Sequence, residues 1–168
     1  MSHKAPRGWV VTWVVLLTAA AWLTAAGSGV AAGKAPDFTL KDTTGQDYSL
    51  SQFRGKVVVV NFFTINCQPC RAEMPDLNKI YQEKQGQGLQ VLGICLGTDP
   101  MRLRFLAKQM NLDYPFLVGT DEVDKAYGSI VVVPTTFIID GQGNIVEKIE
   151  HARKKEFFEN LIQKYIGR

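Results

Sequence analysis

The stretch KVVVVNFFTINCQPCRAEMP, residues 56–75, joins a run of β-branched and aromatic residues to two cysteines three positions apart. A continuous apolar run of this kind is typical of a strand that is buried on both faces of a sheet. From Cys70 to Lys84 apolar residues recur at helical spacing, at Met74, Leu77, Ile80 and Tyr81. The stretch therefore predicts a central strand over 56–63 and a helix that begins at the cysteine pair.

Strand and helix signals alternate on both sides of this stretch. Residues 38–50 predict an N-terminal hairpin of two short strands around a polar turn. Further strands are predicted at 89–96, 116–118, 131–139 and 145–149, and helices at 101–110, 121–128 and 153–166. Pro134 interrupts the third of these strands, which forms a hairpin with the fourth. This order predicts a three-layer α/β domain.

The chain begins with a segment that is predicted to enter a membrane. Lys4 and Arg7 precede an uncharged apolar stretch of 18 residues, Trp9 to Ala26. As a helix this stretch would span about 27 Å, which is close to the hydrocarbon thickness of a bilayer. The small residues at 30–32 would also serve as a cleavage site ahead of Gly33.

Two interpretations of residues 1–33 remain, a signal anchor and a cleaved signal peptide. Trp9 and Trp22 lie near the two ends of the apolar stretch, as expected of interfacial aromatic rings, and we favour the anchor for this reason. Either interpretation holds the positive N-terminus in the cytoplasm. We therefore expect residues 34–168 at the cell membrane, on its periplasmic or extracytoplasmic side, or secreted there after cleavage near Gly33.

Composition is that of one globular domain. The chain is 46% hydrophobic and 21% charged, which is typical of neither disordered nor fibrous proteins. Residues 34–168 fall close to the commonest domain size. Apart from Lys4 and Arg7, basic and acidic residues nearly balance, which argues against nucleic acid as a partner. Three cysteines are too few for a disulfide-stapled scaffold.

Cys67-Gln68-Pro69-Cys70 is the predicted site of chemistry. At the start of a helix, unpaired backbone N–H groups and the positive end of the helix dipole stabilise a thiolate and lower the pKa of its thiol. We therefore expect Cys67 to be the nucleophile, and Cys70 to be the resolving thiol that attacks the mixed disulfide. Pro69 suits the first helical turn, where its missing N–H is not needed.

A metal site is the alternative interpretation of the pair. A structural zinc site needs four ligands, and beyond the pair the chain holds only Cys95, His151 and His3 as further Cys or His ligands. A copper-delivery module on the same fold would need a wider cysteine spacing and a histidine, for which only His151 is available. We therefore expect a redox pair that requires no metal and no cofactor.

Two segments carry a resemblance to a known family. NFFTINCQPCRAEMP (61–75) and VPTTFIID (133–140) resemble the active-site and cis-proline segments of membrane-anchored thioredoxin-like proteins of the TlpA/ResA type. The resemblance covers about residues 35–168 and implies a thioredoxin-like fold with a central mixed sheet. It implies that Pro134 is cis and packs beside Cys67, with the Val133 backbone available to pair with an extended substrate.

Around the pair, the resemblance places substrate near Val133, Asn66, Gln68 and Pro69. Asn66 stands where thioredoxin-like proteins usually have Trp, so the surface beside the nucleophile is more polar. Asn61 stands where thioredoxins often have a buried Asp, and an amide cannot take a proton from the second cysteine.

Glu73 follows Cys70 by three residues and shares its helical face. The resemblance implies that this acid tunes the protons of the pair. A solvated first-turn glutamate, favoured by the helix dipole, is the alternative. Cys95 lies in the apolar segment 91–96, which predicts a buried inert thiol, with a regulatory third thiol as the alternative.

Taken together, the family resemblance implies an extracytoplasmic thiol-disulfide oxidoreductase. We expect it to reduce protein disulfides, for example the haem-binding cysteines of apocytochrome c, with electrons from a membrane thiol donor. No histidine lies between the cysteines, so we expect a reduction potential nearer roughly −270 mV than −120 mV. A thiol peroxidase is the alternative; it would need Pro-x-x-x-Thr-x-x-Cys, and although Thr64 fits, Val60 occupies the proline position.

Overall fold

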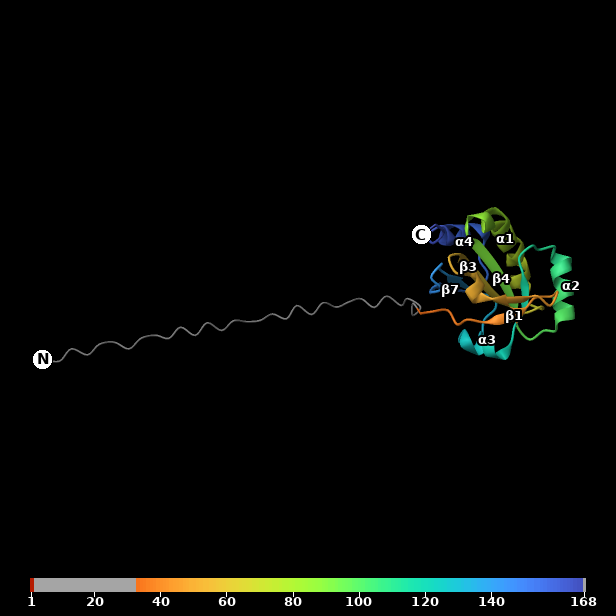
Figure 1. Cartoon of the computed structure of the whole chain (residues 1–168), viewed down its shortest axis with the longest axis horizontal. Coiled ribbons are helices and arrows are strands. Elements are labelled where there is room, and N and C mark those ends of the chain that lie inside the picture. Colours follow the sequence, from red (N-terminus) through yellow and green to blue (C-terminus); the bar gives the residue numbers. More distant parts are fainter. Residues whose placement is uncertain (2–32, 168) are drawn as a thin grey trace.

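The computed structural model describes Met1 and residues 33–167 (Figure 1). The predicted membrane segment, Trp9 to Ala26, lies outside the described residues. Within the described part of the chain, no helix has the length and apolar character needed to cross a bilayer.

A five-stranded mixed sheet forms the middle of the fold. Its strands are β3 (Val57–Phe63), β4 (Leu89–Cys95), β5 (Phe116–Val118), β6 (Thr135–Ile139) and β7 (Ile145–Glu150). They lie in the order β5-β4-β3-β6-β7, with β4 parallel to β3 and β5, and β6 antiparallel to β3 and β7. The predicted mixed sheet is confirmed, and β3 is its central strand.

Each residue of β3 is buried, because helices or loops cover both faces of the sheet. The side chains of Val57, Val59 and Phe63 lie in the core on one face of the sheet. Those of Val58, Val60 and Phe62 lie in the core on the other face. A strand that is buried on both faces does not need to alternate polar and apolar residues, which explains the continuous apolar run in the sequence.

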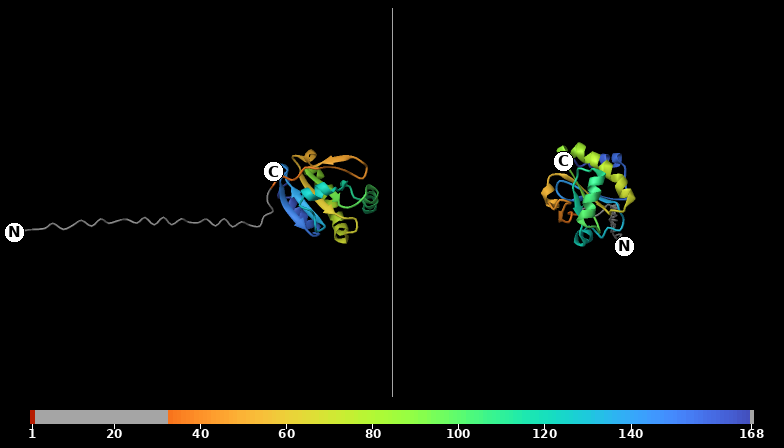
Figure 2. Two further views of the ribbon diagram at one scale, coloured as in Figure 1. Left: turned by 90° about the horizontal axis from the view of Figure 1, so that it is seen from below. Right: turned by 90° about the vertical axis from the view of Figure 1, so that its right-hand side faces the viewer.

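Three helices cover one face of the sheet, α1 (Gln68–Lys84), α2 (Pro100–Met110) and α4 (Lys155–Ile162). The short helix α3 (Asp121–Ala126) and the N-terminal hairpin cover the other face, as Figures 1 and 2 show from three directions. The hairpin strands are β1 (Thr39–Lys41) and β2 (Asp47–Ser49), which form a separate sheet. Two short 3₁₀ turns, Leu50–Phe53 and Gln85–Gln87, follow β2 and α1.

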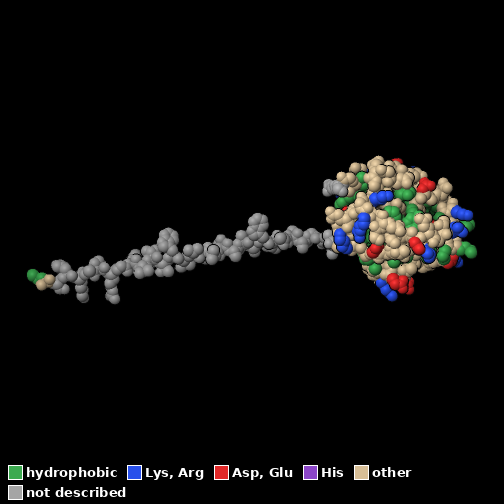
Figure 3. All heavy atoms as spheres, viewed as in Figure 1, with side chains coloured by type: hydrophobic (Ala, Val, Ile, Leu, Met, Phe, Trp, Pro, Cys, Tyr) green, Lys and Arg blue, Asp and Glu red, His purple; other side chains and the backbone are tan. Residues whose placement is uncertain are grey.

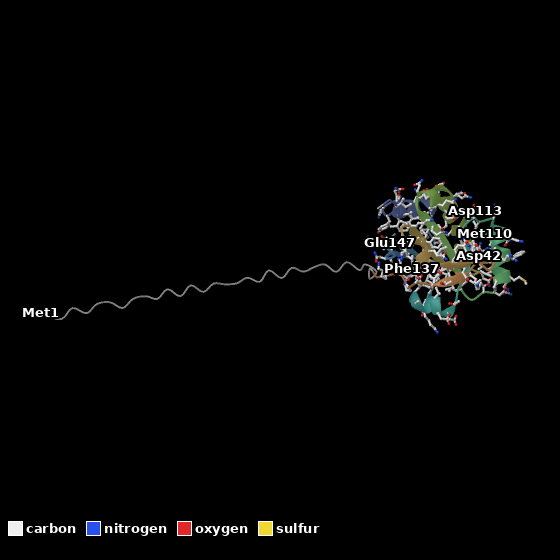
Figure 4. The ribbon with its side chains drawn as sticks, viewed as in Figure 1. Met1, Asp42, Met110, Asp113, Phe137 and Glu147 are labelled. Atoms are coloured by element: carbon white, nitrogen blue, oxygen red, sulfur yellow. A yellow bond between two sulfur atoms is a disulfide. The ribbon has the colours of Figure 1, made fainter. Side chains whose placement is uncertain are left out.

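Side-chain hydrogen bonds fix α1 on the sheet. The buried Asn78 accepts a hydrogen bond from the Asp113 backbone N–H (2.8 Å) and donates one to the Asp113 carboxylate (3.2 Å). Asp113, labelled in Figure 4, precedes β5, so these bonds tie the middle of α1 to the edge of the sheet. The start of α1, which holds the cysteine pair, is positioned by this anchored helix.

Two predicted elements are shorter by four residues or more than the sequence pattern indicated. The strand predicted over 131–139 begins only at Thr135. Pro134 has no N–H to donate to a sheet ladder, and the residues before it leave the sheet. The last helix covers Lys155–Ile162 instead of 153–166. Before it, the Arg153 N–H bonds to Glu73 of α1, and after it residues 163–167 form turns.

Candidate active site

The cysteine pair lies at the junction of the central strand and α1. β3 ends at Phe63, and Cys67 is the N-cap residue of α1. Cys67 and Cys70 form a disulfide, with their sulfurs 2.03 Å apart. Cys67 is half-buried, whereas Cys70 is buried in the core beneath it. An incoming sulfur can therefore reach Cys67 more readily than Cys70.

Backbone groups at the start of α1 surround the Cys67 sulfur. The Cys70 N–H points to Cys67 Sγ at 3.1 Å, and the first turn of the helix holds no acidic residue. The same N–H and the positive end of the helix dipole would stabilise a Cys67 thiolate after reduction. The geometry therefore favours the thiolate form of Cys67 once the disulfide is reduced.

The loop before β6 faces the pair from the other side. The Val133–Pro134 peptide bond is cis, as the family resemblance implied, and the Val133 carbonyl O lies 3.8 Å from Cys67 Sγ. Val133 is half-buried and Pro134 is buried. Asn66, Gln68 and Pro69 are exposed around the pair, so the structure gathers the expected substrate-contacting residues on one surface.

Glu73 is buried, so the alternative of a solvated glutamate is wrong. Its side chain is 3% exposed, and its two carboxylate oxygens have different donors. Asn61 Nδ2 donates to Oε1 (3.0 Å), and the Arg153 backbone N–H donates to Oε2 (2.7 Å). Asn61 Nδ2 also bonds Thr136 Oγ1 on the neighbouring strand (2.8 Å). The amide at position 61 therefore holds the acid in place instead of replacing it.

Burial raises the pKa of Glu73 from its ordinary value of 4.5 to about 7, and the charge of Asp76 adds to the rise. Hydrogen bonds from Arg153 and Asn61, and the charge of Arg153, oppose this rise in pKa. Near pH 7 both protonation states of Glu73 are therefore populated. A carboxyl group with this pKa, one helical turn from Cys70, can accept or give a proton at neutral pH.

Cys95 is buried at the end of β4, as expected. Burial raises the pKa of its thiol to about 12, so the thiolate is scarce near neutral pH. Within residues 33–167 no three His, Cys, Asp or Glu side chains cluster closely enough to hold a metal ion.

The sequence did not indicate two contributors to the site. The Arg153 N–H reaches Glu73 from a segment 80 residues away, and no local pattern marks this contact. The other contributor is a surface of exposed side chains on α2, at Met101, Arg102 and Phe105, which borders the cysteine turn. The helical spacing of Met101 and Phe105, away from the inward-facing Leu103 and Leu106, was the available signal.

Comparison with known proteins agrees with this geometry. The model of the AhpC/TSA family matches residues 31–148. The thiol-disulfide oxidoreductase ResA of Geobacillus thermodenitrificans is 37% identical over 131 residues, which cover 77% of this chain and 75% of that protein. The chain belongs to the ResA-type family. The Geobacillus kaustophilus ResA is 35% identical over 138 residues, 81% of this chain and 79% of that protein.

Solved structures show the same fold. A thiol:disulfide interchange protein of the thioredoxin family from Chlorobium tepidum superposes with a TM-score of 0.76 at 29% identity. The match covers 82% of this chain and 99% of that chain. The expected thioredoxin-like fold is confirmed, and this ResA-type chain is a thiol-disulfide oxidoreductase with its disulfide-forming pair at Cys67 and Cys70.

Proposed function

We propose that this protein reduces protein disulfides outside the cytoplasm, with Cys67 as the attacking thiol and Cys70 as the resolving thiol. The observation that carries the proposal is the asymmetry of the pair. Cys67 lies at the N-cap with a backbone N–H at its sulfur, while Cys70 is buried one turn further along the helix.

The reaction consists of two thiol-disulfide exchanges. The Cys67 thiolate attacks one sulfur of the client disulfide, forming a mixed disulfide and releasing the other client sulfur as a thiolate, which takes up a proton. Cys70 then loses its proton and attacks Cys67 Sγ, which closes the Cys67–Cys70 disulfide and releases the second client thiol. Two electrons pass to the client, and a dithiol donor must return them to the pair.

Glu73 is the proposed proton acceptor for Cys70. A buried thiol resists ionisation, so the second exchange needs a nearby base. Glu73 lies on the same helical face as Cys70, and its pKa of about 7 leaves a carboxylate available near neutral pH.

The direction of transfer follows from how strongly the reduced pair is stabilised. The helix start favours the Cys67 thiolate, but a charged Glu73 opposes it, and no histidine lies between the cysteines. We therefore expect a potential near roughly −270 mV, in the range of thioredoxin. Such a pair donates electrons to client disulfides.

Location and partners rest on the N-terminal segment and on the family. Lys4 and Arg7 before the apolar stretch Trp9 to Ala26 support export, with residues 34–168 on the outer side of the membrane. In that compartment the pair would need a membrane thiol donor to be reduced again. The cysteines of apocytochromes that await haem are the client class that the family resemblance supports.

Equilibration with glutathione and dithiothreitol buffers at pH 7 tests this proposal. We expect a potential near roughly −270 mV, and a value above about −180 mV would refute the assignment as a reductant. Glu73→Gln removes a negative charge near the pair, so its potential should be less negative than that of the wild type. Cys95→Ala serves as the control and should leave the potential unchanged.

A further inference from the structure

Exposed apolar side chains gather around the cysteine turn. Among residues 33–167, four large apolar side chains are exposed, Met101, Phe105, Val131 and Phe157. The first three line two grooves that meet at Ile65 and Asn66, next to Cys67. In Figure 3 hydrophobic and basic side chains lie together at the right-hand edge, where α2 runs in Figure 1. Exposed apolar groups concentrated beside a reactive sulfur mark a contact surface for a partner.

We call the first groove the α2 groove. It encloses about 540 Å³ between the cysteine turn and the outer side of α2. Ile65, Met101 and Phe105 supply its apolar surface, with Phe105 70% exposed and Met101 81% exposed. This volume accommodates a large side chain together with its neighbours, and no residue that lines the groove is acidic.

Two arginines border the α2 groove. Arg71 Nη2 donates to Gln109 Oε1 at 2.9 Å, and Arg102 Nε lies 3.7 Å from Oδ2 of the exposed Asp99. A guanidinium group has five N–H donors, so a single contact leaves most of them for a ligand. Exposed ion pairs such as Arg102–Asp99 are also weak. The groove therefore presents positive charge beside an apolar surface, which complements a segment with an aromatic and an acidic side chain.

The groove lies on a path across the reactive sulfur. Asn66 precedes Cys67 and lines both grooves, and Val133, whose carbonyl O lies 3.8 Å from the Cys67 sulfur, lines the second groove. A client chain that extends along Val133 and places its sulfur at Cys67 would continue over Asn66 to α2. The side chains next to the client cysteine would then enter the α2 groove.

We propose that the α2 groove binds the client segment beside the reacting cysteine, and selects segments that carry an aromatic or long aliphatic side chain and an acidic side chain. This inference rests on the proposed function, because it assigns the substrate preference of the same Cys67 site. It commits to a protein client, since a small disulfide would leave Phe105 and Met101 uncovered.

Three synthetic peptides, each carrying one cysteine as a 2-thiopyridyl disulfide, provide the test. The cysteine is flanked by Phe and Glu in the first peptide, by Phe and Lys in the second, and by Ser and Lys in the third. The Cys67 thiolate of reduced, full-length protein attacks the peptide sulfur and releases 2-thiopyridone, and Cys70 then releases the peptide thiol. Stopped-flow absorbance gives each rate, divided by the rate for the uncharged 2-thiopyridyl disulfide of mercaptoethanol.

The wild type should favour the Phe/Glu peptide over the Ser/Lys peptide about tenfold, a difference of about 1.4 kcal/mol. Phe105→Ser should remove the advantage of Phe over Ser, and Arg102→Glu should remove the advantage of Glu over Lys. Phe157→Ser on α4 and Arg104→Glu on α2 are matched controls at exposed positions outside the groove, and should keep the preference. Added salt should weaken the preference of the wild type for Glu over Lys in the peptide, because it screens the charge of the arginines.

Equal normalised rates for the three peptides in the wild type would overturn the groove assignment. So would a preference that survives in Phe105→Ser and Arg102→Glu, or a wild-type dimer in sedimentation that Phe105→Ser dissociates, because a second copy would then cover the groove. A failure of the proposed function looks different. In that case the wild type would react with every peptide no faster than Cys67→Ser.

Discussion

Cys67 and Cys95 lie near the same end of the sheet but in opposite surroundings. Cys95 ends β4, and Cys67 follows the neighbouring parallel strand β3 by four residues. Cys95 packs inside the sheet, where burial raises the pKa of its thiol to about 12. Cys67 caps a 17-residue helix, with a backbone N–H at its sulfur and one side open to solvent. Four residues beyond the strand end therefore separate a buried thiol from one that the start of a helix can activate.

Glu73 adds a third environment to this comparison. Burial raises the pKa of Glu73 as it does that of Cys95, but Glu73 has hydrogen-bond donors on both carboxylate oxygens. These bonds stabilise the charged form and hold the pKa at about 7. A buried group with two such donors stays able to exchange protons near neutral pH, whereas the Cys95 thiol, with one backbone hydrogen bond from Ile65, does not.

The largest expected effect separates the two cysteines by activity. Cys67→Ser should abolish insulin reduction by the protein, because no other exposed thiol starts a helix among the described residues. Cys95→Ala should leave this activity largely intact. Turbidity of precipitating insulin B chain measures both rates. If the Cys95 variant also loses activity, a three-thiol mechanism replaces the one proposed.

The second effect concerns Glu73 and the stability of the oxidised protein. The folded state raises the pKa of Glu73 from 4.5 to about 7, so it favours the protonated acid. Below pH 4.5 the protonated Glu73 makes its full contribution to the free energy of unfolding. This contribution, about 3 kcal/mol in all, is lost as the pH rises through 7. Urea unfolding between pH 4 and 8 measures this loss.

Glu73→Gln should flatten this pH dependence, since an amide does not titrate. Glu156→Gln, at an exposed position on α4, is the matched control and should retain the wild-type slope. An unchanged slope in Glu73→Gln would show that another group titrates, and that Glu73 does not differ from Cys95 in its ability to exchange protons.

Local patterns were sufficient to predict the main elements. The uninterrupted apolar run at 57–63 specified a strand covered on both faces, and the helical spacing after Cys70 specified α1. The N-terminal hairpin and the order of strands and helices also followed from local signals. These features depend on residues close in sequence, so the sequence alone carries them.

Long-range contacts were not predictable in the same way. The spacing of Cys70 and Glu73 placed both on one helix face, but whether that face met solvent depended on Asn61 of β3 and on Arg153. The start of the strand predicted over 131–139 has a local cause instead, because Pro134 has no N–H for the ladder and the strand begins at Thr135. The surroundings of Glu73 are decided by tertiary packing, which overrides local propensity.

Alkylation of the reduced protein, resolved by cysteine and by pH, separates the reactivity of the Cys67 thiol from that of the two buried thiols. Iodoacetamide reacts with thiolates, and peptide mass spectrometry gives a separate rate for Cys67, Cys70 and Cys95. We expect that near pH 7 Cys67 is labelled well before the other two, with a midpoint below the usual thiol pKa of about 8.5. Labelling of Cys67 and Cys95 at equal rates, or a Cys67 midpoint above about 8.5, would contradict it.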